Sequence, residues 1–494
     1  MTYRPPLSTL LLSFFTVAAL VTTGCHKNNP GIPATLSVSP AIDTIGGTVT
    51  ITGSGFNTDP AKDIVSFNDT VVATVLSATA TTLTIQVPYY TARDRITVKN
   101  KDNGQAWQTI QIFTVAPKFY PQTVAPGYPI NIIAGGGILA SDYSVKFGSA
   151  QGQITGLIDA FMTVTVPEGA TSGPITVLYK GQPVNSLTNF TVAPVGQVTT
   201  LVSGFTTPLG MAFDKNGNLF VSDLQGGVIK KITPDGTASI FAGDGTFNGS
   251  DGPLSTAGVY GANSLVFTAN GDLYFTVPWY SYIRRIHSDS ITTFTTAAGP
   301  HNSTVLSPTG ICMNASGDLI VSDNTYMQIK KVTLDGTVTI LAGQGTQGVA
   351  NGPAASATFS GPTSLALDPT GNLYIADGDA IRMLSGGTVS TFAGSYNDFK
   401  DGVGAIACFN QPASIVRDGS GNIYVADRGN QVIRMITPAG VVTTIAGKPK
   451  QKGKQDGTGA NALFNDPSGI AIDKNGVIYV SDYSNGIIRK IVLH

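Results

Sequence analysis

A seven-residue phrase recurs six times in the second half of the chain. The first copy is "GNLFVSD" from Gly217, and the other copies begin at Gly271, Gly317, Gly371, Gly421 and Gly476. Successive copies therefore lie 46 to 55 residues apart. Repeats of this length build propellers or solenoids, in which each unit packs only against its neighbours. No other feature of the sequence restricts the fold as strongly.

Each repeat has the pattern of four short β-strands. An apolar stretch such as "SLALD" at 364–368 comes first, and a tight turn with an Asn-Gly or Ser-Gly pair leads into the repeated phrase. A third strand holds Ile and basic residues, as in "IRMI" at 433–436, and a fourth reads "VTTIAG" at 442–447. Four strands and no helical pattern in each unit favour a propeller.

The order of the strands predicts how the ring closes. The last repeat ends after its third strand, in "IRKIVLH", whereas a strand of the missing type, "GQVTTLVSG", stands at 196–204 before the first repeat. An N-terminal strand that completes the last blade would leave only short edges. The sequence therefore predicts a six-bladed propeller over 196–494, closed by its N-terminal strand.

The repeated phrase and the third strand, as in "GNIYVAD" from Gly421 followed by "IRMI", resemble the NHL repeat family over about 196–494. This resemblance implies a six-bladed propeller. NHL propellers bind RNA, proteins or peptides, and related six-bladed folds include lyases, lactonases and strictosidine-synthase-like enzymes. The fold alone does not choose among these functions.

Two segments of about 80 residues precede the repeats and alternate as short strands between Gly and Pro turns. Residues 34–115 contain "GGTVTITGSGF" from Gly46, which resembles the IPT/TIG family of immunoglobulin-like domains. Residues 116–193 contain a weaker copy, with "INIIAGGGI" at 130–138. In extracellular bacterial proteins such modules usually act as spacers. The chain is thus predicted to be all-β, with two Ig-like β-sandwiches followed by the propeller.

The N-terminus has the pattern of an export signal. The apolar run from Leu7 to Val21 is too short for a comfortable membrane span, so residues 1–24 are predicted to be a signal peptide. Small residues followed by Cys25 resemble the lipobox of bacterial lipoproteins, which implies acylation of Cys25 and a tether at 25–33. A secretory signal with an incidental cysteine is the alternative. The resemblance implies a lipid anchor in the bacterial envelope, with the outer membrane favoured and the leaflet left open.

Composition excludes several classes of function. The net charge is -1 and no long run of Lys or Arg occurs, so nucleic acid is not a predicted partner. Three cysteines are too few for a disulfide scaffold. Cys312 and Cys408 lie in apolar surroundings and are assigned to packing, with a bridge between them left open. The protein is predicted to be a monomer.

The propeller segment lacks the residues that its catalytic relatives need. A lyase of this fold uses zinc held by three histidines, and the segment has only His287, His301 and the terminal His494. Lactonases and strictosidine-synthase-like enzymes use a Glu, but the only Glu of the chain is Glu168. We therefore predict no catalytic residue, metal or cofactor. A lyase or lactonase with a rebuilt site is the least favoured alternative.

The repeated phrase ends in Asp in five of its six copies. These residues are predicted to lock the turn between the second and third strands, by accepting hydrogen bonds from turn amides and by pairing with basic residues such as Arg434. The five residues are Asp223, Asp323, Asp377, Asp427 and Asp482. Asp-Gly pairs between the repeats, at Asp251, Asp401 and Asp456, are predicted to be turns, with calcium binding as the alternative.

One face of the ring is the candidate face for a ligand, because function usually lies on long loops held by a rigid scaffold. The long loops between blades are 244–259, 344–358, 395–408 and 448–463. On this face the second copy ends in Val277, followed by "PWYSYIRR". Exposed Trp and Tyr offer flat rings to sugars or peptide side chains, although Trp279 folded onto its own hairpin or onto a neighbouring domain is the alternative. The candidate ligand-binding residues are Trp279, Tyr280, Tyr326, Tyr483 and Arg428.

These features predict a non-catalytic envelope lipoprotein whose propeller binds a polysaccharide or a protein. A protein–protein scaffold in an envelope complex is the second hypothesis. Exposed aromatic rings would favour a glycan, whereas a large apolar patch on the long-loop face would favour the scaffold.

Overall fold

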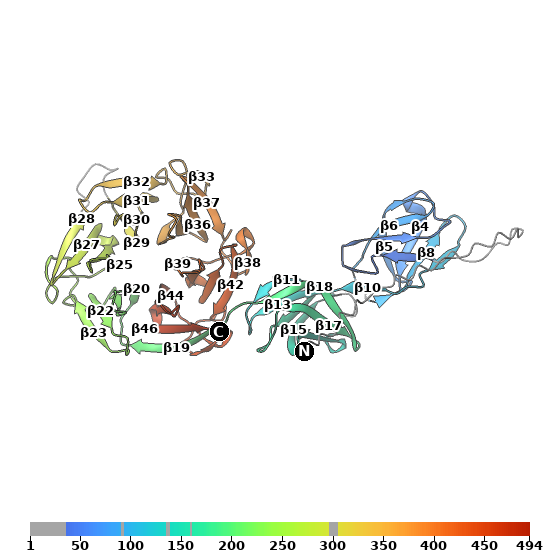
Figure 1. Ribbon diagram of the computed structural model, residues 1–494, viewed down its shortest axis with the longest axis horizontal. Helices are drawn as coiled ribbons and strands as arrows, with labels where there is room; N and C mark the ends of the chain where they lie inside the picture. Colours follow the sequence, from blue (N-terminus) through green and yellow to red (C-terminus); the bar gives the residue numbers. More distant parts are fainter. Residues whose placement is uncertain (1–35, 90–92, 135–138, 159–160, 296–304) are drawn as a thin grey trace, which may run out of the picture.

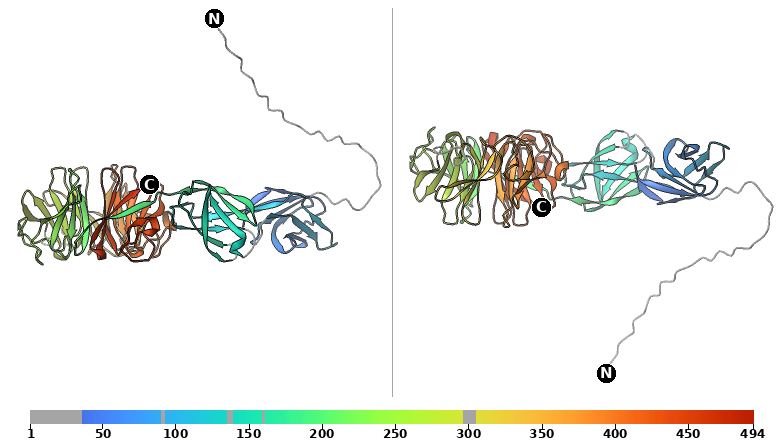
Figure 2. Two further views of the ribbon diagram at one scale, coloured as in Figure 1. Left: turned by 90° about the horizontal axis from the view of Figure 1, so that it is seen from below. Right: turned by 90° about the horizontal axis from the view of Figure 1, so that it is seen from above.

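The computed structural model describes residues 36–89, 93–134, 139–158, 161–295 and 305–494 (Figure 1). Two β-sheet domains stand in line beside a ring-shaped propeller, and Figure 2 shows the propeller edge-on as a flat disc. The predicted signal peptide and tether, Cys25 and His301 lie outside the described residues. Within the described part, no helix is both long enough and apolar enough to cross a membrane.

The first domain has two sheets that enclose one hydrophobic core. Val49 and Ile51, from the "GGTVTITGSGF" segment, are fully buried in it, and Trp107 packs against Phe56 with ring centroids 6.0 Å apart. Trp107 is therefore a core residue. The seven-stranded sheet has the order β1 (Ser37–Ser39), β3 (Thr48–Thr52), β6 (Thr82–Gln86), β5 (Val71–Ala78), β4 (Asp63–Phe67), β8 (Ile96–Asn100) and β9 (Ala106–Gln108), and the second sheet has the order β2 (Ile42–Thr44), β10 (Phe113–Ala116) and β7 (Arg93–Asp94).

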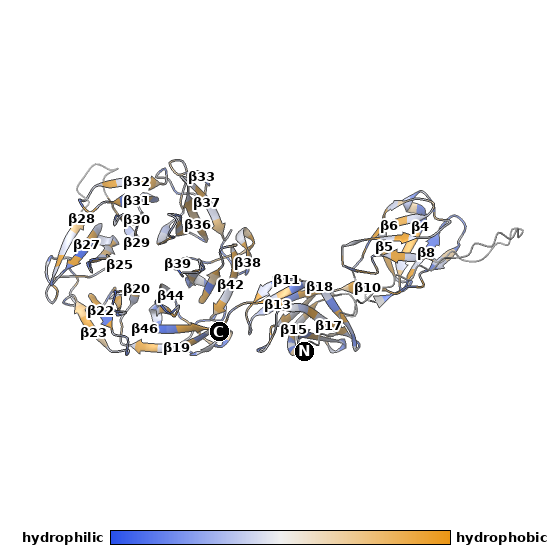
Figure 3. Ribbon diagram, viewed as in Figure 1, coloured by the Kyte–Doolittle hydropathy of each residue, from blue (hydrophilic) through white to orange (hydrophobic). Residues whose placement is uncertain are grey.

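The second domain is one sheet of eight strands with its own core. Alternate residues point inward, so that Ile130 and Ile132 are fully buried and Asn131 between them is exposed. The strand order is β11 (Lys118–Tyr120), β13 (Pro129–Ile133), β16 (Phe161–Thr165), β15 (Ala150–Ile158), β14 (Tyr143–Phe147), β17 (Gly173–Tyr179), β18 (Gln182–Val192) and β12 (Thr123–Val124). Apolar residues run along these strands in Figure 3.

The six repeats form the six blades of the propeller, as predicted, with four antiparallel main strands in each blade. Blade one has β20 (Pro208–Phe213), β21 (Leu219–Asp223), β22 (Val228–Ile232) and β23 (Ala238–Ala242); blade two has β25 (Leu265–Phe267), β26 (Leu273–Val277), β27 (Tyr282–His287) and β28 (Ser290–Thr295); blade three has β29 (Pro308–Met313), β30 (Leu319–Asp323), β31 (Gln328–Val332) and β32 (Val338–Ala342). Blade four has β34 (Pro362–Leu367), β35 (Leu373–Asp377), β36 (Ala380–Ser385) and β37 (Thr388–Ala393); blade five has β39 (Pro412–Arg417), β40 (Ile423–Asp427), β41 (Val432–Ile436) and β42 (Val441–Ala446); blade six has β44 (Pro467–Ile472), β45 (Ile478–Asp482), β46 (Ile487–Leu493) and β19 (Gly196–Ser203).

Strand β19 completes blade six and so joins the start of the propeller to its end. It pairs antiparallel with β46, and Val198 lies opposite Ile491, both fully buried. The predicted closure by the N-terminal strand is therefore confirmed. Because this strand takes the place of the fourth main strand in the last blade, the two ends of the propeller are joined in one sheet.

Neighbouring blades are joined through their innermost strands. Hydroxyl groups at the end of the second strand donate to a carbonyl of the next blade, as Ser222 does to Asn263 at 3.0 Å and Ser481 does to Leu209 at 2.8 Å. A Cβ atom at Gly210 would lie only 1.8 Å from the carbonyl oxygen of Asn263. The close approach of blades one and two therefore requires glycine at this position.

The second domain is fixed to the rim of the propeller. The Tyr128 hydroxyl donates to the carbonyl oxygen of Gly447 at 2.8 Å, and Ala460 packs against the core of the second domain. Burial raises the pKa of Tyr128 well above its usual value, so this hydroxyl stays a donor.

Cys312 and Cys408 are free thiols, so they do not form the bridge that the sequence left open. Burial raises the pKa of Cys312 to about 12, which disfavours the reactive thiolate. In a Cys25→Ser chain at pH 8, a thiol reagent such as DTNB is expected to leave Cys312 unmodified until the protein is unfolded in guanidinium. Rapid modification of Cys312 in the folded chain would contradict this expectation.

Candidate functional site

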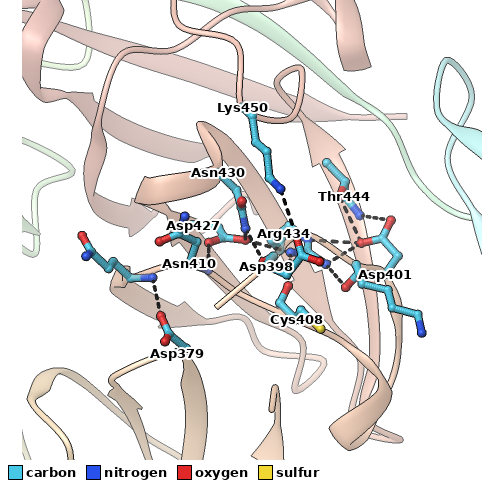
Figure 4. Close-up of polar contacts among 12 residues, drawn as sticks. Asp379, Asp398, Asp401, Cys408, Asn410, Asp427, Asn430, Arg434, Thr444 and Lys450 are labelled. Atoms are coloured by element: carbon cyan, nitrogen blue, oxygen red, sulfur yellow. Dashed lines mark hydrogen bonds and ion pairs between the residues drawn. The ribbon is translucent and has the colours of Figure 1, made fainter. Parts of the chain in front are cut away.

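The Asp residues that end the second strands are buried and paired, as Figure 4 shows for blade five. Asp427 accepts from Arg434 at 2.7 Å, from the Asn430 amide at 2.9 Å and from the backbone N–H of Asn410 at 2.9 Å. Asp482 is held in the same way by Arg489 at 2.9 Å. Each carboxylate thus joins three parts of its blade.

The backbone N–H groups that donate to these carboxylates are mostly not those of the turn between the second and third strands, which the sequence predicted. In blades one, three, four, five and six they belong to the segment that precedes the first strand, 16 or 17 residues before the Asp. Only Asp323, among the described residues, also accepts from backbone N–H groups of its own turn, those of Thr325 and Tyr326. The sequence suggested the adjacent turn because it is near in the chain, whereas the tertiary fold brings the first strand beside the second.

The loop aspartates contact the same arginines from the opposite side. Asp401 accepts from Arg434 at 2.6 Å and from the N–H of Thr444 at 3.0 Å, so that Arg434 lies between two carboxylates (Figure 4). Asp456 has the same partners in blade six, Arg489 and Thr200. Burial opposes ionisation of Asp456, but the hydrogen bonds from Thr200 and the charge of Arg489 outweigh it and hold its pKa below the usual value.

These loop carboxylates are therefore occupied by protein donors. Across the described ranges, no three His, Cys, Asp or Glu side chains gather so that they could hold a metal ion. His287 lies on the surface and contacts Asp272 at 2.6 Å. Burial would raise the pKa of Asp272, but His287 and Arg285 hold it below its usual value.

Blade two lacks the Asp of the other blades. Val277 takes its place and is fully buried, so that the buried Arg284 has Asp251, at 2.9 Å, as its acidic partner. Burial lowers the pKa of Arg284, and Asp251 opposes this effect only in part. The charge of Arg284 is therefore less well compensated than that of Arg434.

Val277→Asp is expected to raise the free energy of unfolding by about 1 kcal/mol, because the new carboxylate would accept from a buried guanidinium. Urea denaturation followed by circular dichroism measures this change. The control is Val221→Asp, at a fully buried site of blade one, which is expected to lower stability by at least ~2 kcal/mol. Equal destabilisation by the two substitutions would contradict the expected result.

An aromatic cluster lies on the long-loop face at blades one and two. Trp279 is 58% exposed and Tyr280 is 36% exposed, and both belong to the 3-10 turn η3 (Pro278–Tyr280). The Trp279 ring lies 5.1 Å from that of Tyr260, which meets Phe247 edge-on at 4.6 Å. Tyr280 stacks on Tyr282 at 5.9 Å. We call these five residues the aromatic cluster: Phe247, Tyr260, Trp279, Tyr280 and Tyr282.

The local backbone holds the cluster in place. Gly261 has φ of +82°, and a Cβ there would come within 3.1 Å of the Trp279 ring, so glycine lets the indole lie close to the chain. The Tyr280 hydroxyl donates to the Phe247 carbonyl at 3.4 Å. Trp279 thus packs against the adjacent loop of its own propeller, and 58% of it stays exposed.

Sequence reasoning missed Phe247 and Tyr260. Both precede Trp279 by about 20 to 30 residues, and only the packing of the 244–259 loop against the η3 turn brings them together. In the sequence, each of the two is an aromatic residue at a loop position where the corresponding residues of other repeats are polar. Tyr282 is half-buried and stacks against Tyr280.

The remaining candidates belong to other blades. The Lys330 ammonium lies 4.4 Å from the centroid of the Tyr326 ring, in blade three. The Arg428 guanidinium, in blade five, lies 5.5 Å from the ring of Tyr483, in blade six, so this contact joins the two blades. Arg428 also borders a small cavity of about 70 Å³ between the innermost strands, beside Ser264 and Ser414. These residues therefore form two separate pairs, neither of which is part of the aromatic cluster.

Comparison with known families finds both resemblances. The IPT/TIG domain matches residues 33–115, and the NHL repeat matches residues 464–491. The chain is 30% identical over 177 residues to Protein SUPPRESSOR OF QUENCHING 1, chloroplastic, from Arabidopsis thaliana. That stretch is 33% of this chain, and it spans only 17% of the length of the Arabidopsis protein.

Several solved structures are similar in fold. A structural genomics protein of unknown function from Bacteroides thetaiotaomicron is 16% identical, with TM-score 0.49, covering 94% of this chain and 99% of that chain. An auxiliary nutrient binding protein from the same organism is 17% identical, with TM-score 0.46 and the same coverage. A virginiamycin B lyase from Staphylococcus aureus is 17% identical, with TM-score 0.41, covering 61% of this chain and 100% of that chain. None of these likenesses assigns a ligand or an activity to this chain, which contains an IPT/TIG domain and an NHL repeat within a six-bladed propeller.

Proposed function

We propose that this protein is a non-catalytic lipoprotein of the bacterial envelope and that its propeller binds a polysaccharide at the aromatic cluster. The observation that supports this site is the exposure of its rings, 58% for Trp279 and 70% for Phe247, on a face where long loops gather. Isolated exposed apolar residues need no explanation, but adjacent exposed rings mark binding surfaces.

The geometry of the cluster suits a sugar. The face of an indole covers the apolar C–H face of a pyranose ring, and neighbouring polar groups meet its hydroxyls. Here the polar residues around Phe247 are Asp244 and Thr246, which are exposed, and Asn248, which is half-buried; all three belong to the 244–259 loop. Thr246 donates to Asp244 at 2.6 Å, and Asn248 accepts from the N–H of Ser250 at 3.0 Å, so the loop is ordered before a ligand arrives. Such preorganisation reduces the entropy lost on binding.

The rest of the chain supports display at a membrane. Cys25 would carry the lipid, and residues 25–33 would form the tether. The two β-sheet domains would act as spacers, since they stand in line between residue 36 and the propeller (Figure 2). We expect the protein to act as a monomer on the outer membrane.

Trp279→Ala is expected to weaken glycan binding at least tenfold, because it removes the largest exposed ring of the cluster. The full chain is first applied to a glycan array, and the affinity for the strongest glycan is then measured by calorimetry for both proteins. Thermal unfolding should be unchanged, since Trp279 contributes little to the core.

The matched control is Tyr396→Ala, which removes another exposed ring, in the 395–408 loop before blade five. It should leave glycan binding within twofold of the parent chain. If the Trp279→Ala chain and the parent chain bind the glycan found on the array with equal affinity, the assignment of the site is wrong. Binding to a protein and to no glycan would favour the scaffold hypothesis instead.

A further inference from the structure

The outer edges of the six blades are of two kinds. In blades two, four, five and six a two-residue strand from the preceding long loop pairs with the fourth strand and covers its edge. These covering strands are β24 (Gly252–Pro253), β33 (Gly352–Pro353), β38 (Gly402–Val403) and β43 (Gly457–Thr458). In the described residues, the sheets of blades one and three end at β23 and β32 without such a strand.

The same division appears in the third strand of each blade. In the blades that have a covering strand, the central basic residue of the third strand is an Arg. These residues are Arg284, Arg382, Arg434 and Arg489. The two blades without one have Lys230 and Lys330 at this position. An Arg has two terminal nitrogens and can hold both the strand Asp and the loop Asp, as Arg434 does, whereas Lys has one ammonium.

The fourth strand follows this division. The residue opposite the Arg is Thr293, Thr391, Thr444 or Thr200, and the residue opposite the Lys is Ile240 or Ile340. In blade two the Thr293 N–H and hydroxyl donate to Asp251, at 3.0 and 2.8 Å. Thr is therefore found opposite the Arg because it hydrogen-bonds to the Asp of the covering loop. Ile is found at this position in the blades whose edge has no covering strand.

Strand β23 of blade one is an open edge in the part of the chain that the structure describes. Ile240 is 64% exposed, and Ala238 and Ser239 beside it are also exposed. Since Ile240 takes the place of Thr293, its N–H points outward. The strand reads "ASIFA", without charge or Pro, although such residues usually protect exposed edges. Figure 3 shows β23 as an apolar strand on the outer rim.

We propose that the edge of β23 binds an extended segment of a partner polypeptide, in the position that β24 takes on blade two. An open edge offers N–H and C=O groups at the spacing of a β-strand, which a second backbone satisfies and a glycan does not. Four edges of this same propeller are covered by extended backbone in this way. An apolar side chain of the segment would cover Ile240. This surface is distinct from the aromatic cluster, and the inference does not depend on the proposed function.

Peptide selection tests this surface. Random extended peptides are panned against the full chain, and affinities of the enriched peptides are measured by fluorescence polarisation. We expect peptides that bind with micromolar dissociation constants and that slow hydrogen exchange of the segment containing Ala238 and Ile240. Ile240→Pro removes an outward N–H and should weaken binding at least tenfold, whereas Ile240→Thr keeps that N–H and should bind within threefold.

Two further measurements keep the outcome clear. Trp279→Ala should leave peptide affinity unchanged, which separates this surface from the glycan site. Hydrogen exchange of the unsubstituted chain reports the position of the peptide even if Ile240→Pro unfolds blade one. The proposal is overturned if no peptide is enriched, or if enriched peptides protect another segment. It is also overturned if the chain forms a dimer that Ile240→Pro dissolves, since the occupant would then be a second copy.

Discussion

A chain that begins at Phe205 is expected to lose the cooperative unfolding of the propeller, although it keeps every residue of the six repeats. This chain lacks β19, which pairs along β46 from Gly196 to Ser203. Without it, blade six loses its outermost main strand, and the apolar side of β46 around Ile491 becomes exposed. Burial of Val198 alone contributes about 1.5 to 3 kcal/mol, and the backbone pairing adds to it.

The matched comparison is a chain that begins at Ala193 and keeps β19. We expect the midpoint of thermal unfolding to be at least ~10 °C lower for the chain that begins at Phe205. Adding the peptide "APVGQVTTLVSG", residues 193–204, should restore part of the difference, because the binding of a native strand stabilises the folded state. Identical calorimetric transitions for the two chains would show that the ring does not depend on this strand.

Asp427→Asn is expected to destabilise the propeller by about 3 to 5 kcal/mol, because it removes one of the two carboxylates around a fully buried guanidinium. The Asn side chain has nearly the same shape, so the effect reports charge and hydrogen bonding more than packing. Its amide group would also face the Asn430 amide, which now donates to Asp427 at 2.9 Å. Urea denaturation of both proteins measures the difference.

Asp289→Asn serves as the control, since Asp289 is exposed and lies in a turn of blade two. It should change stability by less than ~0.5 kcal/mol. If Asp427→Asn costs no more than this control, the carboxylate is not a structural lock. Blade two makes the test informative: with Val277 at this position, Asp251 is the one acidic partner of Arg284 within the described residues.

Much of the fold could be predicted because the same strand pattern repeats along the sequence. Six copies of one strand pattern identify the blades, and a leftover strand at residue 196 identifies the closure. The Asp residues could be recognised as structural candidates from their repetition. Their backbone partners could not, because Asn410 and Asp427 are separated by 17 residues and meet only when the first strand pairs with the second.

The candidate site was predictable only in part. Trp279 and Tyr280 stand out because they interrupt the repeat, and that interruption is visible in the sequence. Phe247 and Tyr260 stand out only when the long loop packs against the η3 turn. The open edge of β23 was not predictable either, because it depends on which loops reach around to a neighbouring blade.

The sequence by itself determined the number of blades, the order of their strands and the β-sheet character of the domains before them. These follow from local alternation and from a period that repeats along the chain. The tertiary structure decided which aromatic rings share one surface, which arginines lie between two carboxylates and which blade edge stays open. These depend on contacts between residues distant in the chain, and only the closed ring brings such residues together.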